Sequence, residues 1–382
     1  NRFGYTRNIL LAPKDSTMGL PLTEQTLPDV LGKANYKTKA IGKWHLGAHK
    51  SLIPENRGFD EFYGFIIGGH RYFPNDLVLN DLKEARSQMD GYITKLLDNG
   101  KRIETSKYLT EELSNNAVNF IDENSDNPFF LYLSYNAPHT PLQATENDLK
   151  RNMHIEKEKR RTYAAMVTSL DDGVGLILDK LEEKKISDNT IVVFLSDNGG
   201  VEWYNHSDNG ILRGGKGEFF EGGIRVPFVM QWPNVIPKGS VYNKPIIALD
   251  LFATAASVAN AEQYIEGELD GVNLIPYIIG ENNKLPHNFL YWQNRDKDID
   301  VIRGERYKYL RMGAEEYIFD LKNDISEEVN IISSSKDIYD DLKFNFKEWN
   351  KEMIDPVFLD LGSGKEYNKL HPDRWYDSNL KK

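Results

Sequence analysis

Three strand-like segments of this sequence, two of them apolar runs, each lead directly into a cluster of polar residues. They are residues 37–42, followed by Lys-Trp-His-Leu-Gly; residues 129–135, followed by Asn-Ala-Pro-His; and residues 190–195, followed by Ser-Asp-Asn-Gly-Gly. Between the last two segments, apolar side chains from Tyr163 to Leu181 follow helical spacing, which predicts a crossover helix. The segments at 129–135 and 190–195 are predicted to be buried parallel strands. Alternating strands and helices predict an α/β fold with a mostly parallel central sheet flanked by helices, and ligands bind beyond the carboxyl ends of such strands. We therefore expect the three polar clusters to converge.

The remaining periodic segments extend this pattern and then change it. Residues 23–35 and 249–259 have the spacing of amphipathic helices, and residues 225–232 predict a further strand. After Gly280, short aromatic segments alternate like antiparallel strands and are followed by one amphipathic helical segment; they are residues 288–293, 300–311, 316–321 and 337–353. We predict an α/β domain over residues 1–285 and a smaller C-terminal α+β subdomain with an antiparallel sheet over residues 286–382.

The composition excludes several classes of partner and chemistry. Acidic side chains outnumber basic ones by 58 to 47 in the 382 residues, and the net charge of −11 opposes binding to nucleic acid or to an anionic membrane surface. No apolar stretch approaches the roughly 18 residues of a membrane span. The absence of cysteine excludes disulfides, thiolate catalysis and cysteine-ligated zinc. We expect no nucleic-acid partner and no membrane partner.

The motif Asp197-Asn198-Gly199-Gly200 places two oxygen-bearing side chains at the end of a predicted strand. Hard oxygen ligands suit Ca²⁺, with Mg²⁺ as the alternative ion, and the glycines let the backbone approach closely. The same residues are also typical of a plain turn. Their location at a strand end favours a metal site with Asp197 and Asn198 as ligands.

Four basic side chains lie in comparable places. Lys43 and His45 would point to the same side of an extended chain and suit an anionic oxygen, although a surface lysine beside a core histidine is the alternative. His139 lies between two prolines on a stiff loop and is a candidate general acid. Lys216 has glycines on both sides that would let backbone and ammonium approach an oxyanion, and a flexible solvated loop is the competing interpretation.

Taken together, these motifs closely resemble the type I sulfatases, the formylglycine-dependent family of the alkaline-phosphatase-like superfamily. The resemblance rests on residues 42–47 (GKWHLG), 57–64 (RGFDEFYG), 137–141 (APHTP), 196–199 (SDNG), 212–217 (LRGGKG) and 221–227 (EGGIRVP), and on a C-terminal signature at 317–321 (YIFDL) followed by Asp324, Glu327, Glu328 and Asn330. The order and spacing of these motifs over nearly the whole chain make the resemblance specific.

The resemblance implies a sulfuric ester hydrolase whose catalytic domain is residues 1–285. Lys43 and Lys216 would hold the sulfate oxygens. His45 would assist the nucleophile, His139 would protonate the departing oxygen, and the Asp-Asn pair would ligate calcium. The chemistry agrees, because positioned ammonium groups, an imidazolium and a divalent cation stabilise the negative charge on the oxygens of a reacting sulfate ester.

One part of the family pattern does not occur in this sequence. The family nucleophile is a formylglycine made from Cys or Ser in a Cys/Ser-x-Pro-x-Arg motif, upstream of a segment resembling the one that begins Asn1-Arg2-Phe3-Gly4, and two further acidic calcium ligands lie near the family's first strand. We expect formylglycine in an N-terminal segment outside this sequence; a separate polypeptide and a degenerate, non-hydrolysing relative are the alternatives. A sheet without its central strands exposes apolar edges, which predicts self-association or a partner segment.

Substrate identity is the least constrained feature. His70, Arg71 and the aromatic loop at 203–206 supply groups that suit a sulfated sugar, although ordinary loop packing would explain them equally well. These loops favour a sulfated carbohydrate over a small aryl sulfate. Two rivals stay open: a phosphatase or phosphodiesterase of the same superfamily, and a glycan-binding pseudoenzyme or inactive fragment. Export to the periplasm or the cell exterior is an expectation from the resemblance alone.

Overall fold

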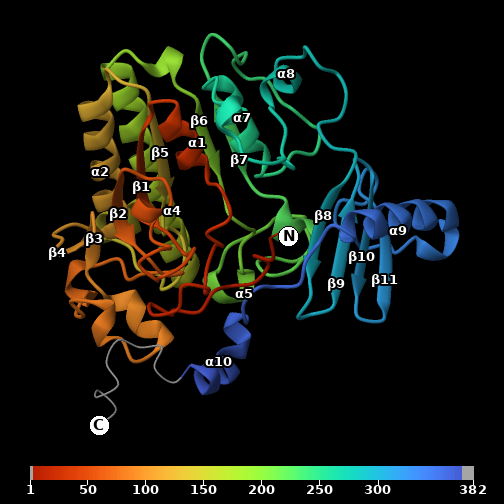
Figure 1. Ribbon diagram of the computed structural model, residues 1–382, viewed down its shortest axis with the longest axis horizontal. Coiled ribbons are helices and arrows are strands. Elements are labelled where there is room, and N and C mark those ends of the chain that lie inside the picture. Colours follow the sequence, from red (N-terminus) through yellow and green to blue (C-terminus); the bar gives the residue numbers. More distant parts are fainter. Residues whose placement is uncertain (1–2, 372–382) are drawn as a thin grey trace. The chain divides into compact units, whose positions relative to one another are not determined.

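The computed structural model describes residues 3–371, and the chain divides into two compact units built from non-contiguous segments (Figure 1). Unit 1 comprises the described part of Asn1–Thr6 with Asp188–Val258 and Glu268–Pro356. Unit 2 comprises Arg7–Ser187, Ala259–Gly267 and the described part of Val357–Lys382. The domain boundary between residues 285 and 286 stays a prediction. Asn1 and Arg2, with which one family-like segment begins, lie outside the described residues.

Unit 2 is built on a five-stranded mixed sheet with the strand order β4-β3-β2-β1-β5. The strands β2, β1 and β5 are parallel, and β3 and β4 add an antiparallel edge. The helices and strands of this unit are α1 (Leu27–Lys33), β1 (Lys37–Lys43), β2 (Glu61–Phe65), β3 (Leu96–Asp98), β4 (Lys101–Ile103), α2 (Leu109–Asn124), β5 (Phe129–Ser134), α3 (Glu146–Arg151), α4 (Glu158–Glu183) and α10 (Gly364–Leu370). The strands predicted at 37–42 and 129–135 are confirmed as β1 and β5, and the helix predicted from Tyr163 to Leu181 is confirmed as part of α4.

The core of unit 2 lies between this sheet and its helices. Leu113 and Ala117, one turn apart on α2, are fully buried against the strands, and Met166 brings α4 into the same core. Full burial of one leucine contributes roughly 1.5–3 kcal/mol, so this α2 face secures the parallel strands. β5 is the edge strand, and its Tyr132 is 45% exposed, which keeps self-association through this edge a prediction.

Unit 1 contains two smaller sheets and the long helix that follows the second of them. Its helices and strands are β6 (Val192–Leu195), α5 (Glu202–Asn205), α6 (Glu221–Ile224), β7 (Phe228–Gln231), α7 (Asp250–Val258), α8 (Ile275–Ile278), β8 (Leu290–Asn294), β9 (Ile299–Arg303), β10 (Tyr307–Met312), β11 (Glu315–Asp320) and α9 (Lys336–Asn350). Within the described residues, no helix is both long enough and apolar enough to cross a membrane.

The strand predicted at 190–195 differs from expectation. The structure pairs β6 with β7, and the pair is antiparallel, whereas the prediction was a buried parallel strand. The two strands are joined by a glycine-rich loop and two short helices that reverse the chain, and a parallel pair would have required a crossover. Phe194 and Val229 remain 40% and 61% exposed, so burial was also overestimated.

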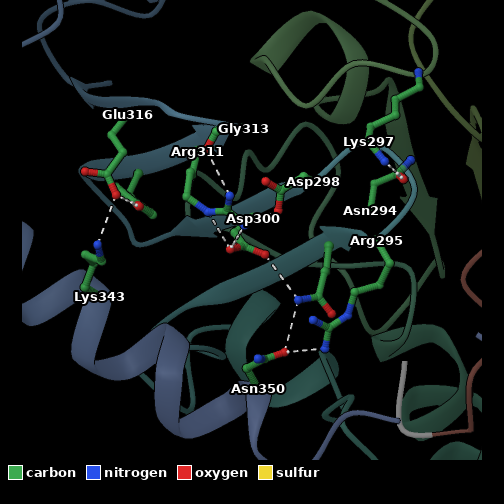
Figure 2. A network of polar contacts seen from close by, with 12 residues as sticks. Asn294, Arg295, Lys297, Asp298, Asp300, Arg311, Gly313, Glu316, Lys343 and Asn350 are labelled. Atoms are coloured by element: carbon green, nitrogen blue, oxygen red, sulfur yellow. Dashed lines mark hydrogen bonds and ion pairs between the residues drawn. The ribbon is translucent and has the colours of Figure 1, made fainter. Parts of the chain in front are cut away.

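The C-terminal antiparallel sheet is confirmed, with the strand order β11-β10-β9-β8 and α9 packed against β9 and β10 (Figure 1). The single strand predicted at 300–311 is wrong, because a turn after Arg303 divides it into β9 and β10. Figure 2 shows the polar network on this sheet, in which the Arg311 guanidinium contacts Asp300 and Asp298, and Lys343 of α9 reaches Glu316 of β11.

Candidate functional site

Lys43 and His45 lie at the carboxyl end of β1, on either side of a buried tryptophan. Lys43 pairs with Phe65, the last residue of β2, and Trp44 anchors the segment by donating its indole N–H to the Leu52 carbonyl oxygen at 2.7 Å. Trp44 is 6% exposed, whereas Lys43 and His45 are half-buried. The two basic side chains therefore leave the core at the strand end.

The backbone of His45 is held in a left-handed conformation, with φ of 58°, which is uncommon for a residue other than glycine. Its N–H donates to the Ile66 carbonyl oxygen at 3.0 Å. Gly68 lies directly against the imidazole: a Cβ at this position would be 2.7 Å from Cε1 and 2.8 Å from Nε2. The position and orientation of the His45 ring thus depend on the loop that follows β2.

His139 lies on the loop after β5, the third parallel strand. Its backbone N–H donates to the Asn136 carbonyl oxygen at 2.8 Å, and Nδ1 contacts the Thr140 carbonyl oxygen at 2.7 Å. Because a carbonyl oxygen only accepts, Nδ1 carries a proton in this geometry. The Tyr72 hydroxyl donates to the His139 carbonyl oxygen at 2.8 Å, which joins this loop to the segment after β2.

His70 and Arg71 lie in the segment after β2 that Tyr72 joins to the His139 loop. His70 is fully buried beside Phe65, and its ring nitrogens lie 2.9 and 2.8 Å from the carbonyl oxygens of Arg71 and Thr94. Burial is the largest influence on the pKa of His70 and lowers it to about 4, whereas the hydrogen bonds to the two carbonyl oxygens act to raise it. This geometry favours a packing role for His70 over the predicted substrate contact. Arg71 is exposed, so its side chain fits a surface contact.

In unit 1, Asp197 and Asn198 follow β6. Asp197 is exposed; Asn198 is half-buried and donates its amide to the Gly199 carbonyl oxygen at 2.8 Å, so its Oδ1 is the atom suited to a cation. Calcium takes 6–8 oxygen ligands, and these two side chains fit it in kind but supply only part of such a set. Among the residues that the structure describes, no group of three or more His, Cys, Asp or Glu side chains is arranged to hold a metal ion.

Lys216 is exposed on the glycine-rich loop before α6, and this loop lies against the Asp197-Asn198 motif. The Lys216 N–H donates to the Gly200 carbonyl oxygen at 3.4 Å. The two loops are also joined by Asn209, whose side chain bonds to the backbone of Gly200 and to the Gly214 carbonyl oxygen at 2.9 Å. The structure therefore brings Lys216 and the Asp197-Asn198 motif together within unit 1, and Lys43, His45, Arg71 and His139 together within unit 2.

Asn209 was missed by the sequence analysis. Its only local signal is the Asn-Gly dipeptide with Gly210, which is typical of a turn and gives no hint of a link between two loops. The buried ion pair of Glu221 with Lys308 and the contact of Glu221 with Glu327 were likewise not predicted, because Glu221 is 87 and 106 residues from these partners along the chain.

Comparisons with known proteins agree on one family. A family model described as Sulfatase matches residues 1–261, and a second, described as N-sulphoglucosamine sulphohydrolase, C-terminal, matches residues 215–353. An uncharacterized sulfatase, YdeN, of Escherichia coli is 32% identical over 347 residues, covering 83% of this chain and 58% of its own length. N-acetylgalactosamine-6-sulfatase of Canis lupus familiaris is 34% identical over 311 residues, covering 79% of this chain and 55% of its own length.

A solved structure is similar over the entire chain. The crystal structure of Ps i-CgsB in complex with k-i-k-neocarrahexaose is 35% identical and superposes with a TM-score of 0.86, covering 100% of this chain and 86% of that one. This chain spans little more than half the length of the curated relatives described above. From the family match over most of its residues, the chain belongs to the sulfatase family.

Proposed function

We propose that this protein is a sulfuric ester hydrolase that acts on a sulfated carbohydrate. The observation that carries the proposal is the gathering of Lys43, His45 and the His139 loop at the carboxyl ends of three adjacent parallel strands in a member of the sulfatase family. Such strand ends are where α/β folds bind ligands.

Each basic side chain has a distinct task in this proposal. Lys43 and Lys216 bind the sulfate oxygens by charge-assisted hydrogen bonds, which strengthen as negative charge develops in the transition state. His139 donates a proton from Nε2 to the departing sugar oxygen, since Nδ1 is directed to the Thr140 carbonyl oxygen. His45 assists the nucleophile from its position against Gly68.

Two cofactors complete the proposal. Asp197 and Asn198 would contribute oxygen ligands to Ca²⁺, with Mg²⁺ as the alternative, and the bound cation would offset negative charge on the sulfate. The family's formylglycine would supply the nucleophile from a segment outside this sequence. The residues of this chain bind and orient the sulfate and hold the proton for the leaving group.

A saccharide substrate is supported by exposed aromatic side chains beside the Lys216 loop. Trp203 and Tyr204 of α5 are 83% and 57% exposed. Glu202 of the same helix accepts a hydrogen bond from the Asn209 N–H at 2.7 Å, which ties the aromatic pair to the loop. Exposed aromatic faces suit a sugar ring, and the exposed Arg71 suits its sulfate group. A relative with 35% identity was solved with a neocarrahexaose bound, which supports the same class.

Sulfate release from a sulfated oligosaccharide by the full-length protein tests the proposal. We expect Lys216→Ala and His139→Ala each to lower kcat/KM by at least about 100-fold. The matched controls are Lys238→Ala and His154→Ala, which remove exposed side chains outside the site. Binding of the oligosaccharide without any turnover would identify a glycan-binding pseudoenzyme, and turnover of phosphate esters instead would assign the rival enzyme class.

A further inference from the structure

A cluster of buried charges lies directly beneath the Lys216 loop in unit 1. Lys308 of β10 is 0% exposed and forms ion pairs with Glu221 at 3.2 Å and Glu327 at 2.8 Å, whose side chains are 1% and 0% exposed. Arg303 of β9 lies 3.4 Å from the other Glu221 oxygen. Burial is the largest influence on both carboxyls. It raises the pKa of Glu327, whereas the charges of Lys308 and Arg303 outweigh it at Glu221 and lower that pKa.

The cluster is bonded to the backbone as well as to itself. One carboxylate oxygen of Glu327 accepts from the Glu221 N–H at 2.6 Å, which fixes the start of α6. The carbonyl oxygen of Glu327 accepts from the Arg213 guanidinium at 2.8 Å, and that guanidinium lies 4.0 Å from the centre of the Phe220 ring. Glu327 therefore holds both ends of the loop that carries Lys216.

Backbone hydrogen bonds of Gly222 and Gly223 connect the start of α6 to the Lys216 loop and to the Asp197-Asn198 motif. The Gly222 N–H donates to the Arg213 carbonyl oxygen at 2.7 Å, and the Gly223 carbonyl oxygen accepts from the Gly199 N–H at 3.0 Å. The backbones are so close that a Cβ on Gly199 would lie 1.7 Å from the Gly222 carbonyl oxygen. A displacement of α6 would therefore move the Lys216 loop and the Asp197-Asn198 motif together.

A contribution to the free energy of unfolding does not by itself explain why the charges of Glu221, Lys308 and Glu327 are buried. Buried ion pairs are often replaced by packed apolar side chains without loss of stability, whereas they fix geometry because each charge accepts few arrangements. We propose that Glu221, Lys308 and Glu327 form a buried anchor through which the C-terminal sheet positions Lys216 for binding a sulfate group. They act as positioning residues, and the part concerning sulfate rests on the function proposed above.

Hydrogen exchange of single backbone amides tests the anchor independently of function. In Glu327→Gln, a nearly isosteric change, we expect the Gly222 and Gly199 amides to exchange roughly tenfold faster, while amides of β8 keep wild-type rates. Lys308→Met should act in the same direction. The matched controls Glu328→Gln and Lys322→Met, at exposed positions, should leave all these rates unchanged. Wild-type exchange at Gly222 and Gly199 in Glu327→Gln would overturn the proposal.

Affinity for inorganic sulfate tests whether the anchor acts through Lys216. Glu327→Gln should weaken sulfate binding roughly five- to tenfold in the wild-type background and cause no further loss in the Lys216→Ala background. An equal loss in both backgrounds would show that Glu327 does not act through Lys216 and would overturn the positioning role. Failure of the wild-type protein to bind sulfate would count against the proposed function. The exchange rates of the Gly222 and Gly199 amides would then still test whether the anchor holds the two loops.

Discussion

The side chain of Asn209 forms two hydrogen bonds with the backbone of Gly200. Its Oδ1 accepts from the Gly200 N–H at 2.9 Å, and its Nδ2 donates to the Gly200 carbonyl oxygen at 3.0 Å. Nδ2 also donates to the Gly214 carbonyl oxygen at 2.9 Å. One amide side chain thus satisfies polar groups of two loops, each of which carries a candidate functional residue.

Asn209→Ala is expected to loosen both loops at once. The change removes three hydrogen bonds to half-buried backbone groups and should lower the free energy of unfolding by about 1–3 kcal/mol. Urea unfolding measures this cost. Asn345→Ala is the matched control, since Asn345 is half-buried on α9 and its amide donates to Asp341 of the same helix. Equal stability of Asn209→Ala and wild type would show that the bridge does not join the loops in solution.

Gly68→Ala is expected to displace the His45 ring. The new methyl group would come within 2.8 Å of two ring atoms, so the imidazole must move by a few tenths of an ångström or more. We expect a small loss of stability and at least about a tenfold loss of turnover, because catalytic groups tolerate little misplacement. Gly32→Ala is the control: no atom lies within 4 Å of its new Cβ, and it should stabilise α1 by about 0.5–1 kcal/mol. Normal turnover in Gly68→Ala would remove His45 from the mechanism.

His70 should make the protein sensitive to acid. Its pKa is about 4 in the folded protein, because burial disfavours the charged ring, against 6.5 in an unfolded chain. As the pH falls from 6.5 to 4, the unfolded chain binds a proton that the native protein excludes, so the free energy of unfolding decreases, by roughly 3 kcal/mol in total. Above pH 6.5 this stabilisation is fully present.

Urea unfolding at pH 7 and pH 4.5 measures this effect. We expect the loss between the two pH values to be smaller in His70→Gln than in the wild type, since the variant lacks the titrating ring. His154→Gln, at an exposed histidine, should lose as much stability as the wild type. An identical pH dependence in His70→Gln and wild type would contradict the assignment.

Arg311 should stabilise the C-terminal sheet through the network in Figure 2. Its guanidinium donates to Asp300 Oδ2 at 2.8 and 2.6 Å and to Asp298 Oδ1 at 2.8 Å. We expect Arg311→Met to lower the Tm by about 2–4 °C, because hydrogen-bonded charges with little exposure contribute more than exposed pairs. Lys336→Met, which breaks an exposed pair with Asp340, should leave the Tm unchanged. A Tm for Arg311→Met equal to that of wild type would contradict this.

The parallel strands and their functional ends were predictable because their signals are local. β5 is an apolar run of ordinary strand length, β1 and β5 both lead into polar residues, and parallel pairing places such ends at one edge. The alternation of Lys43 and His45 around Trp44 assumed an extended chain, whereas β1 ends at Lys43 and His45 has a left-handed backbone with φ of 58°, so the common direction of the two side chains stays a prediction. Helical spacing along α4 likewise required only one continuous segment.

The remaining features depend on contacts that local patterns do not encode. The antiparallel pairing of β6 with β7 follows from the path of the intervening loop. The burial of His70 follows from carbonyl groups of two segments that enclose its ring. Glu221 and Glu327 meet across 106 residues, so no window of sequence contains both. Long-range polar contacts of this kind decide which candidate residues are held in place.

The central claim is that the ammonium groups of Lys43 and Lys216 both contribute to sulfate binding. Calorimetric titration with inorganic sulfate tests it most directly, using wild type, Lys43→Ala and Lys216→Ala, with Lys50→Ala and Lys238→Ala as controls at exposed positions. We predict sulfate binding of equal affinity in the wild type and in both controls, and binding weakened at least about tenfold in each of the other two variants. Undiminished sulfate binding in either Lys43→Ala or Lys216→Ala would contradict the account.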